Sequence, residues 1–127
     1  MTFFIDNNLG ANLVVGLRAF GEDVIHLTEK FPQNTPDEIW LKEIGERNYF
    51  LITRDERIRW NPAELGAFCK YKVGAFLLGG KNLKKWEIIQ QLIRNWPRIN
   101  EMAGKTRKPF AFRIPPHGTK FSSFQLM

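Results

Sequence analysis

Two aspartates stand just after short apolar runs of the type that forms buried strands. Asp6 follows the run Phe3–Ile5, and Asp55 comes shortly after the run Tyr49–Thr53. In open α/β sheets, ligands bind beyond the carboxyl ends of the strands, so both carboxylates are expected at the ligand-binding edge. If the two strands are near neighbours in the sheet, the two carboxylates converge there.

A second pair of acids is expected near the same edge. Asp37 and Glu38 open a predicted helix that follows the second predicted strand. Carboxylate oxygens suit Mg²⁺ or Mn²⁺, and such an ion can activate a water molecule and neutralise charge on a phosphodiester. We therefore predict a Mg²⁺ or Mn²⁺ site whose catalytic and metal-binding residues are Asp6, Asp37 and Asp55, with Glu38 and Glu64 as weaker metal-ligand candidates.

Three of these acids also have a purely structural interpretation. In the stretch Thr35-Pro36-Asp37-Glu38, Thr35 could be the N-cap and Glu38 the N3 residue of a capping box, which is the favoured account of Glu38. Asp37 could merely complement the helix dipole. Asp6 could cap the first helix or bond the turn that follows it.

Three arginines surround Asp55 in the sequence and leave its role open. Asp55 could form a structural ion pair with Arg54, Arg57 or Arg59. Alternatively, Asp55 binds a metal while the arginines hold phosphates by bidentate, charge-assisted bonds. The role favoured for Glu64 is a solvated acid in the first turn of a helix.

Apolar strands alternate with helical patterns along the chain. Strands are expected at 3–5, 23–27, 49–53, 73–78 and 110–114, and helices at 9–20, 35–47, 62–68 and 83–102. Continuous apolar strands separated by helices are typical of a parallel sheet that is covered on both faces. We therefore predict a three-layer α/β/α sandwich with a central, mostly parallel sheet.

Three of the predicted helices carry apolar stripes that are expected to be buried. These stripes are Leu9, Leu13, Val14, Leu17 and Phe20; Ile39, Trp40 and Ile44; and Trp86, Ile89, Leu92, Ile93 and Trp96. Asn8 is expected to cap the first helix, and Gly21 to end it. Pro97 is expected to kink or cap the last helix.

Composition points to one folded domain. The chain has 127 residues, of which 43% are hydrophobic, enough to bury a core. There is no apolar run of about 18 residues, so no membrane span is expected. The start MTFFIDNN lacks the features of a signal peptide, and the single Cys69 suits a reducing compartment, so we expect a cytoplasmic protein.

The charge is distributed unevenly. Residues 1–69 hold 7 Lys/Arg and 11 Asp/Glu, whereas residues 70–127 hold 12 Lys/Arg and 2 Asp/Glu. Such asymmetry is expected where one region holds metal ligands and another meets a polyanion. A solubilising basic surface with a charged tail explains it equally well.

The two histidines do not predict a zinc site. His26 ends an apolar strand and is expected to be a satisfied core or rim histidine. His117 lies in a predicted loop with no second His or Cys at ligand spacing.

Three blocks of the sequence resemble the PIN-like domain family, relatives of the VapC-type toxin ribonucleases. The blocks are FFIDNNLGANLVVGLRAFGEDVIHL, TPDEIWL and FLITRDERIRWNP, and the resemblance spans about residues 3–114. It implies an α/β/α sandwich and metal-dependent cleavage of RNA by clustered acids, which map to Asp6, Asp37 and Asp55. A further family acid, close after the third, has only Glu56 and Glu64 as nearby counterparts.

Basic residues are predicted to bind the nucleic acid, in two groups: Arg54, Arg57 and Arg59, and Lys105, Arg107 and Lys108. Phe110 and Phe112 follow the second group, and charge interleaved with aromatic rings suits single-stranded nucleic acid. The same stretch equally suits a strand that completes the sheet. Trp60 could stack on a base, although anchoring its loop to the core is favoured.

These observations lead to one expected function and one alternative. We expect a metal-dependent endoribonuclease, a hydrolase that is the toxin of a toxin–antitoxin system, with a PIN-like domain at 1–114 and a C-terminal tail at 115–127. The expected partners are an RNA substrate, an antitoxin protein and a second copy of the chain. The alternative is a catalytically weak PIN-like module that binds RNA or a partner protein.

Overall fold

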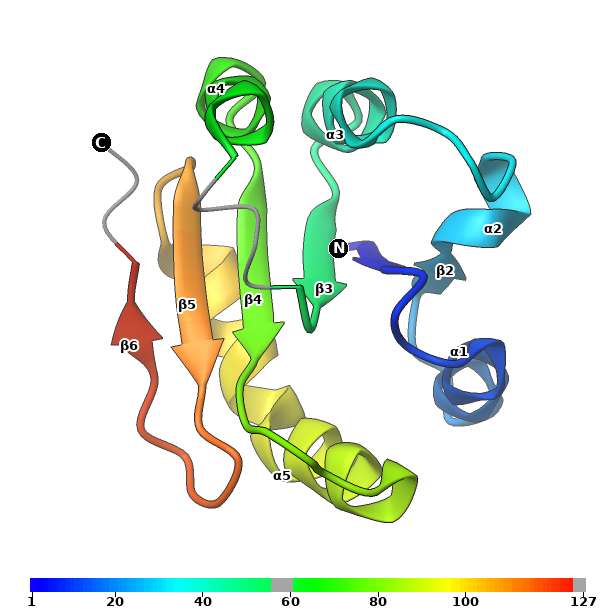
Figure 1. Cartoon of the computed structure of the whole chain (residues 1–127). Coiled ribbons are helices and arrows are strands. Elements are labelled where there is room, and N and C mark those ends of the chain that lie inside the picture. The colour runs from blue at the N-terminus through cyan, green and yellow to red at the C-terminus, as the bar shows by residue number, and fades with distance from the viewer. Residues whose placement is uncertain (56–60, 125–127) are drawn as a thin grey trace.

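The computed structural model describes residues 1–55 and 61–124, and its centre is a six-stranded sheet (Figure 1). The strand order is β2 (Val24–His26), β1 (Phe3–Ile5), β3 (Phe50–Thr53), β4 (Gly74–Leu78), β5 (Phe110–Ile114) and β6 (Ser122–Ser123). Neighbouring strands from β2 to β5 are parallel, and β6 is antiparallel to β5. The predicted mostly parallel sheet is confirmed.

Helices cover both faces of this sheet, as predicted. One face packs against α1 (Ala11–Ala19) and α5 (Lys85–Lys105), and the other against α3 (Asp37–Glu46) and α4 (Pro62–Lys70). Successive strand residues point to opposite faces, so Phe3 and Ile5 join the first core cluster and Phe4 joins the second. A short helix, α2 (Leu27–Lys30), follows β2 directly and was not predicted.

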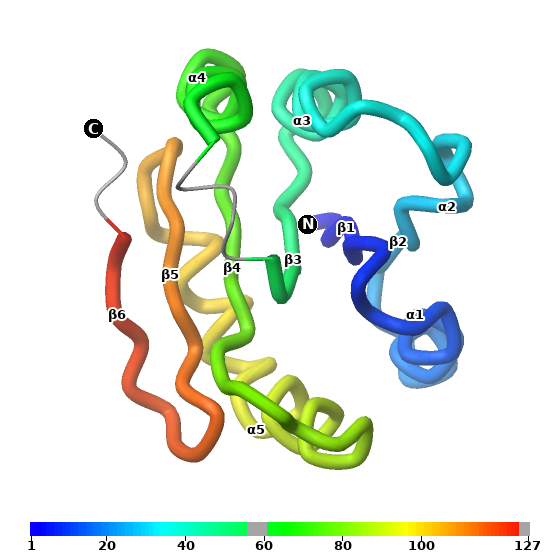
Figure 2. The backbone as a smooth tube through the Cα atoms, in the orientation of Figure 1, coloured from blue at the N-terminus to red at the C-terminus, as the bar shows by residue number. Residues whose placement is uncertain are grey.

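The path of the chain makes the carboxyl end of β1 a special position. From β1 the chain passes to β2 on one side and then returns to β3 on the other side (Figure 2). The register pairs Ile5 with both His26 and Ile52, so the three strands end at one edge. A reversal of strand order of this kind leaves a crevice at the carboxyl edge, and Asp6 is the first residue beyond β1.

The segment after β5 is part of the folded domain in its described portion. β6 pairs with β5, and the side chain of Gln91 holds the start of this segment in place. Gln91 Nε2 donates to the carbonyl oxygens of Gly79 (2.9 Å), Ile114 (3.1 Å) and Pro115 (3.0 Å). The predicted tail therefore folds back onto the sheet up to Phe124, and residues 125–127 lie outside the described residues.

Four positions predicted to be buried are exposed. Their exposed fractions are 87% for Phe20, 54% for Ile39, 65% for Trp86 and 56% for Ile93. The predicted helices are present, but α5 is rotated about its axis so that a different set of its side chains faces the sheet. Its buried face carries two polar residues, Gln91 and Asn95, which a pattern of apolar residues does not reveal.

Two predictions about helix ends have different outcomes. Gly21 follows the end of α1 with a φ of 86°, a value that glycine adopts at little cost, as predicted. Pro97 does not end α5, which continues to Lys105.

Within residues 1–55 and 61–124, no helix combines the length and apolar character that crossing a membrane requires.

Candidate active site

The carboxylate of Asp6 is buried and held in a fixed orientation at the carboxyl end of β1. Its Oδ1 accepts a hydrogen bond from the backbone N–H of Asn7 (2.6 Å). Its Oδ2 accepts one from the hydroxyl of Thr53 (2.7 Å), the last residue of β3. Because Ile5 and Ile52 are paired in register, the residues that follow them lie side by side. The sheet therefore positions this contact across 47 residues of sequence.

Asn8 links the loop after β1 to the loop after β3. Its Nδ2 donates to Thr53 Oγ1 (3.3 Å), and its Oδ1 accepts from the backbone N–H of Arg54 (3.2 Å). The prediction that Asn8 caps α1 is wrong, since the N-cap is Gly10 and has no side-chain hydrogen bond. The side chain of Asn8 instead joins the two loops that carry Asp6 and Asp55.

The environment of Asp6 favours its neutral form. Burial raises the pKa of the Asp6 carboxyl, and the negative charges of Asp37 and Asp55 raise this pKa further. The hydrogen bonds from Thr53 and Asn7 act in the opposite direction, because they stabilise the carboxylate. The structure thus brings three of the predicted acids close enough for Asp6 to sense the other two charges.

Asp37 approaches this group from the first turn of α3. Its Oδ1 accepts a hydrogen bond from the indole Nε1 of Trp40 (3.0 Å), one turn further along the helix. The predicted capping box is wrong: the N-cap is Pro36, and the hydroxyl of Thr35 donates to the Pro32 carbonyl (2.7 Å). Glu38 is exposed in the same turn and has no capping role.

Asp55 lies in the loop after β3, and its backbone N–H donates to Thr53 Oγ1 (3.0 Å). Arg54 next to it donates from Nη2 to the carbonyl of Gly80 (3.1 Å), which ties this loop to the one after β4. Glu64 lies in the first turn of α4, as its structural interpretation predicted. Four residues named in the sequence analysis, Glu56, Arg57, Arg59 and Trp60, lie outside the described residues.

The donor set fits a hydrated divalent ion better than an all-protein metal cage. Among residues 1–55 and 61–124, no three His, Cys, Asp or Glu side chains lie close enough together to hold a metal by themselves. Mg²⁺ keeps several water ligands and commonly uses only one or two carboxylates together with substrate phosphates. Asp6 satisfies this requirement, because each of its oriented oxygens accepts one hydrogen bond and retains a second lone pair.

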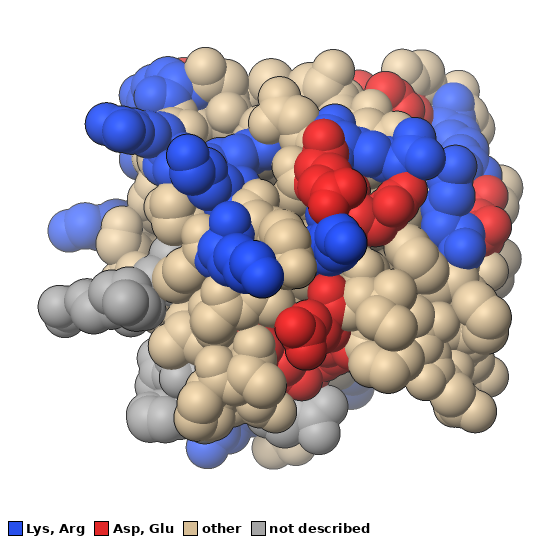
Figure 3. Space-filling view, turned by 90° about the horizontal axis from the view of Figure 1, so that it is seen from above, with Lys and Arg blue, Asp and Glu red and all other residues tan. Residues whose placement is uncertain are grey.

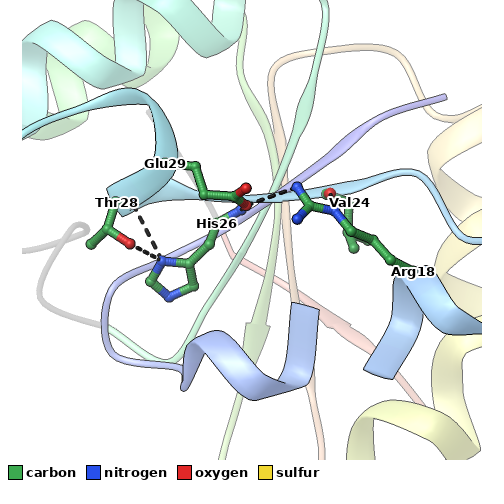
Figure 4. Close-up of polar contacts among 5 residues, drawn as sticks. All are labelled: Arg18, Val24, His26, Thr28 and Glu29. Carbon is green, nitrogen blue, oxygen red and sulfur yellow. Dashed lines mark hydrogen bonds and ion pairs between the residues drawn. The ribbon is translucent and has the colours of Figure 1, made fainter. Parts of the chain in front are cut away.

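His26 supports the loop that carries Asn7 and Asn8, and it is the satisfied histidine that the sequence predicted. Its Nδ1 lies 2.7 Å from Thr28 Oγ1 and accepts from the Thr28 backbone N–H (3.3 Å), which leaves Nε2 as the donor (Figure 4). Nε2 lies 2.8 Å from the carbonyl oxygen of Leu9. This bond fixes the loop between β1 and α1 against the end of β2.

An ion pair next to His26 closes the same corner of the molecule (Figure 4). Glu29 Oε1 accepts from the His26 backbone N–H (2.8 Å) and from Arg18 Nη2 (2.8 Å). The bond from His26, followed by that from Arg18, lowers the pKa of the Glu29 carboxyl. Arg18 also donates from Nε to the Val24 carbonyl (3.0 Å), so α1 is fastened to β2.

The second predicted group of basic residues lies at the opposite edge of the sheet. Lys105, Arg107 and Lys108 precede β5, at the amino ends of the parallel strands. Figure 3 looks onto the side where β3, β4 and β5 begin and shows lysines and arginines gathered over part of it. The Lys108 ammonium donates to Asn48 Oδ1 (2.7 Å) and lies 4.0 Å from the centroid of the Phe50 ring, and burial lowers its pKa.

Three roles in the site were not predicted from the sequence. Asn8 joins the loops after β1 and β3, Thr53 donates to Asp6, and His26 holds the loop between β1 and α1. A polar residue at the end of an apolar strand, as in Thr53, is a usable signal. Its partner, however, is set by the register of β1 against β3, which a single sequence does not give.

With this geometry established, comparison with known families identifies the class of protein. A family model described as a PIN like domain matches residues 1–80, which include β1 to β4 and the acids Asp6, Asp37 and Asp55. The chain belongs to the PIN-like domain family. Comparison with curated proteins and with solved structures returned no match.

Proposed function

We propose that this protein is a metal-dependent endoribonuclease that hydrolyses RNA phosphodiesters at the carboxyl edge of its sheet. The observation that carries the proposal is the buried carboxylate of Asp6, whose pKa is raised by burial and by the charges of Asp37 and Asp55. Clustered carboxylates repel one another, and a bound divalent cation removes that repulsion. Family membership supports hydrolase chemistry, because PIN-like domains are commonly nucleases.

Asp6, Asp37 and Asp55 would hold the ion together with water molecules. When bound, Mg²⁺ or Mn²⁺ supplies an activated water and neutralises the charge that develops on the phosphodiester. Asp6 contributes a ligand that is already oriented by Asn7 and Thr53, so little reorganisation is needed. Asp37 and Asp55 bring their charges from α3 and from the loop after β3. Glu38 and Glu64 remain weaker ligand candidates.

The role as a toxin with an antitoxin partner is part of this proposal and rests on the resemblance to VapC-type toxins. An antitoxin that masks the carboxyl edge would suppress cleavage. A homodimer is the other expected assembly. Both would be measured by copurification and by the mass of the purified protein in solution.

The decisive experiment is cleavage of a mixed RNA pool by the purified protein in Mn²⁺, Mg²⁺ or EDTA. Asp6→Asn is tested beside Asp23→Asn, a matched change at the amino edge, where Asp23 accepts a bond from Thr2. We expect metal-dependent cleavage that falls at least about 100-fold in Asp6→Asn and is unchanged in Asp23→Asn. Cleavage that persists in Asp6→Asn, or in EDTA, contradicts the proposal.

A catalytically weak binding module is the second candidate, and one observation favours it. Within the described ranges, no three metal-ligating side chains gather into a complete site. If the wild-type protein binds single-stranded RNA but does not cleave the pool in any metal, this second candidate replaces the first. Isothermal titration of the wild-type protein with Mn²⁺ would then show no heat of binding at Asp6. The wild type and Asp6→Asn would give the same titration curve.

A further inference from the structure

A small pocket opens beside the acids on the side of the sheet covered by α1 and α5. It has a volume of about 180 Å³ and is lined by Asn8, Leu9, Gly10, Leu13, Lys85, Ile88 and Ile89. Asn8 connects it to the acids, since its side chain bonds Thr53, which in turn bonds Asp6. The pocket is thus two hydrogen bonds from the proposed catalytic carboxylate.

The lining combines apolar side chains with two polar ones. Leu9, Leu13, Ile88 and Ile89 provide the apolar walls, whereas Asn8 and Lys85 provide an amide and a cation. Pockets that enclose drug-sized ligands measure roughly 300–1,000 Å³, so a volume of 180 Å³ suits one flat ring and not a whole nucleotide. A ring held here would leave its sugar and phosphate outside, near the lysine.

The surroundings of the pocket carry positive charge and an exposed ring. The loop between β4 and α5 and the first turn of α5 hold Lys81, Lys84 and Lys85, all exposed at the carboxyl edge. Trp86 is 65% exposed and lies one turn before Ile89 on the same side of α5. Proteins that bind single-stranded nucleic acid combine basic side chains along the phosphate backbone with aromatic rings on which bases stack.

We infer that this pocket accepts one unpaired base of the RNA substrate, next to the nucleotide cleaved at the Asp6 edge. Lys85 and its neighbouring lysines bind the adjoining phosphates. Asn8 presents to the base edge the second N–H and the second lone pair of its amide, which its bonds to Thr53 and Arg54 do not use. The inference deepens the proposed nuclease function and rests on it. It also assigns substrate binding to the β4–α5 loop in place of Lys105, Arg107 and Lys108.

Gly10 is a lining residue of the pocket at which a larger side chain can be added. A Cβ added at Gly10 meets no atom within 4 Å, and its φ of −66° suits any residue. Gly10→Leu therefore adds a side chain at a lining position of the pocket, with no clash at its Cβ. Gly104→Leu is the matched control at the far end of α5, where an added Cβ meets only Met1 Cε at 3.5 Å.

The test measures binding separately from cleavage. Fluorescein-labelled single-stranded RNA of mixed sequence is titrated with full-length Asp6→Asn in EDTA, alone and combined with Gly10→Leu or Gly104→Leu. We expect Gly10→Leu to weaken binding roughly tenfold, and Gly104→Leu to change it less than about twofold. Equal affinities for the three proteins, or absence of RNA binding, overturn the inference.

A second arm identifies what enters the pocket. RNA oligonucleotides with one abasic nucleotide, moved along the strand, should show one position where loss of the base weakens binding to Asp6→Asn but not to the Gly10→Leu combination. If no position behaves in this way, the pocket takes something other than a base, such as an apolar side chain of a protein partner.

The wild-type cleavage assay keeps the two proposals separable. Cleavage with normal KM in Gly10→Leu overturns only the pocket, whereas pocket-dependent binding without cleavage overturns only the nuclease.

Discussion

The carboxyl edge and the amino edge of the sheet are built from the same strands and helices, but they differ in whether their polar side chains are buried. The buried polar side chains of residues 1–55 and 61–124 are Asp6, His26, Thr53, Gln91 and Asn95. Four of these bond groups at the carboxyl ends of strands, and Asn95 donates to the Gly118 carbonyl beyond β5 (3.2 Å). This edge therefore keeps its loops in place with buried hydrogen bonds.

The amino edge is held mainly by backbone turns and by partly exposed side chains. Gly45 and Tyr71 show how closely it packs, because a Cβ on Gly45 would lie 2.2 Å from the Tyr71 carbonyl oxygen. Its charged groups, such as Arg47 and Arg107, are exposed. Buried polar side chains thus distinguish the carboxyl edge, whereas exposed charge is abundant at the amino edge.

The largest effect on stability is expected from removing the hydrogen bonds that the Gln91 side chain donates to Gly79, Ile114 and Pro115. Gln91→Leu removes the Nε2 donor shared by three carbonyl oxygens, of which, among the described residues, only that of Ile114 keeps a backbone donor, the N–H of Gly79. We therefore expect the free energy of unfolding to fall by about 2–4 kcal/mol. The control is Gln90→Leu, an exposed neighbour, expected to change it by less than about 0.5 kcal/mol. Urea denaturation measures both, and equal stabilities would show that the carboxyl edge does not depend on this bond network.

The next effect concerns the orientation of Asp6. Thr53→Val keeps the shape of the side chain but removes the hydroxyl that donates to Asp6 Oδ2. A residue that orients a metal ligand in this way contributes about 10–100-fold to metal affinity or activity. We expect a loss in that range in Mn²⁺-dependent cleavage, partly recovered at higher Mn²⁺ concentration. Thr2→Val, which removes a hydroxyl bonded to Asp23 at the amino edge, should leave cleavage unchanged.

A smaller effect is expected from the charge of Asp6 on stability. Its pKa is raised in the folded state, so the folded protein loses stability as the pH rises through that pKa and the buried carboxylate ionises. In EDTA at pH 7, Asp6→Asn should therefore be more stable than the wild type by about 0.5–2 kcal/mol. The gain should disappear at a pH below the ordinary aspartate pKa of 3.8. A destabilised Asp6→Asn at pH 7 would mean that the carboxylate has a structural role.

The smallest effect is expected on the salt dependence of RNA binding, and it compares a lysine at each end of α5. Lys85 and Lys105 are both exposed, but Lys85 lines the pocket and Lys105 pairs with Glu101 (3.3 Å) at the amino edge. In the Asp6→Asn background, Lys85→Gln should reduce the dependence of RNA affinity on salt by about one phosphate contact, a slope change of roughly 0.7. Lys105→Gln should leave this slope unchanged. The reverse result would return RNA binding to the amino edge.

The layers of the fold follow from the order of apolar runs and helical periods along the chain. Apolar runs such as Phe3–Ile5 and Phe50–Thr53 alternate with helical periods, and this alternation is typical of a covered parallel sheet. The sequence also placed Asp6 and Asp55 just beyond strand ends, because that position depends on local order along the chain.

The contacts between polar groups, in contrast, depend on how distant segments pack together. The register of β1 against β3 brings Thr53 to Asp6, and packing of α5 buries Gln91 while leaving Trp86 exposed. The order of the strands sends Lys105 and Lys108 to the edge away from the acids, although the sequence grouped them with the substrate. Local pattern fixes an element and its position along the chain, but rotation, register and strand order depend on contacts between distant segments.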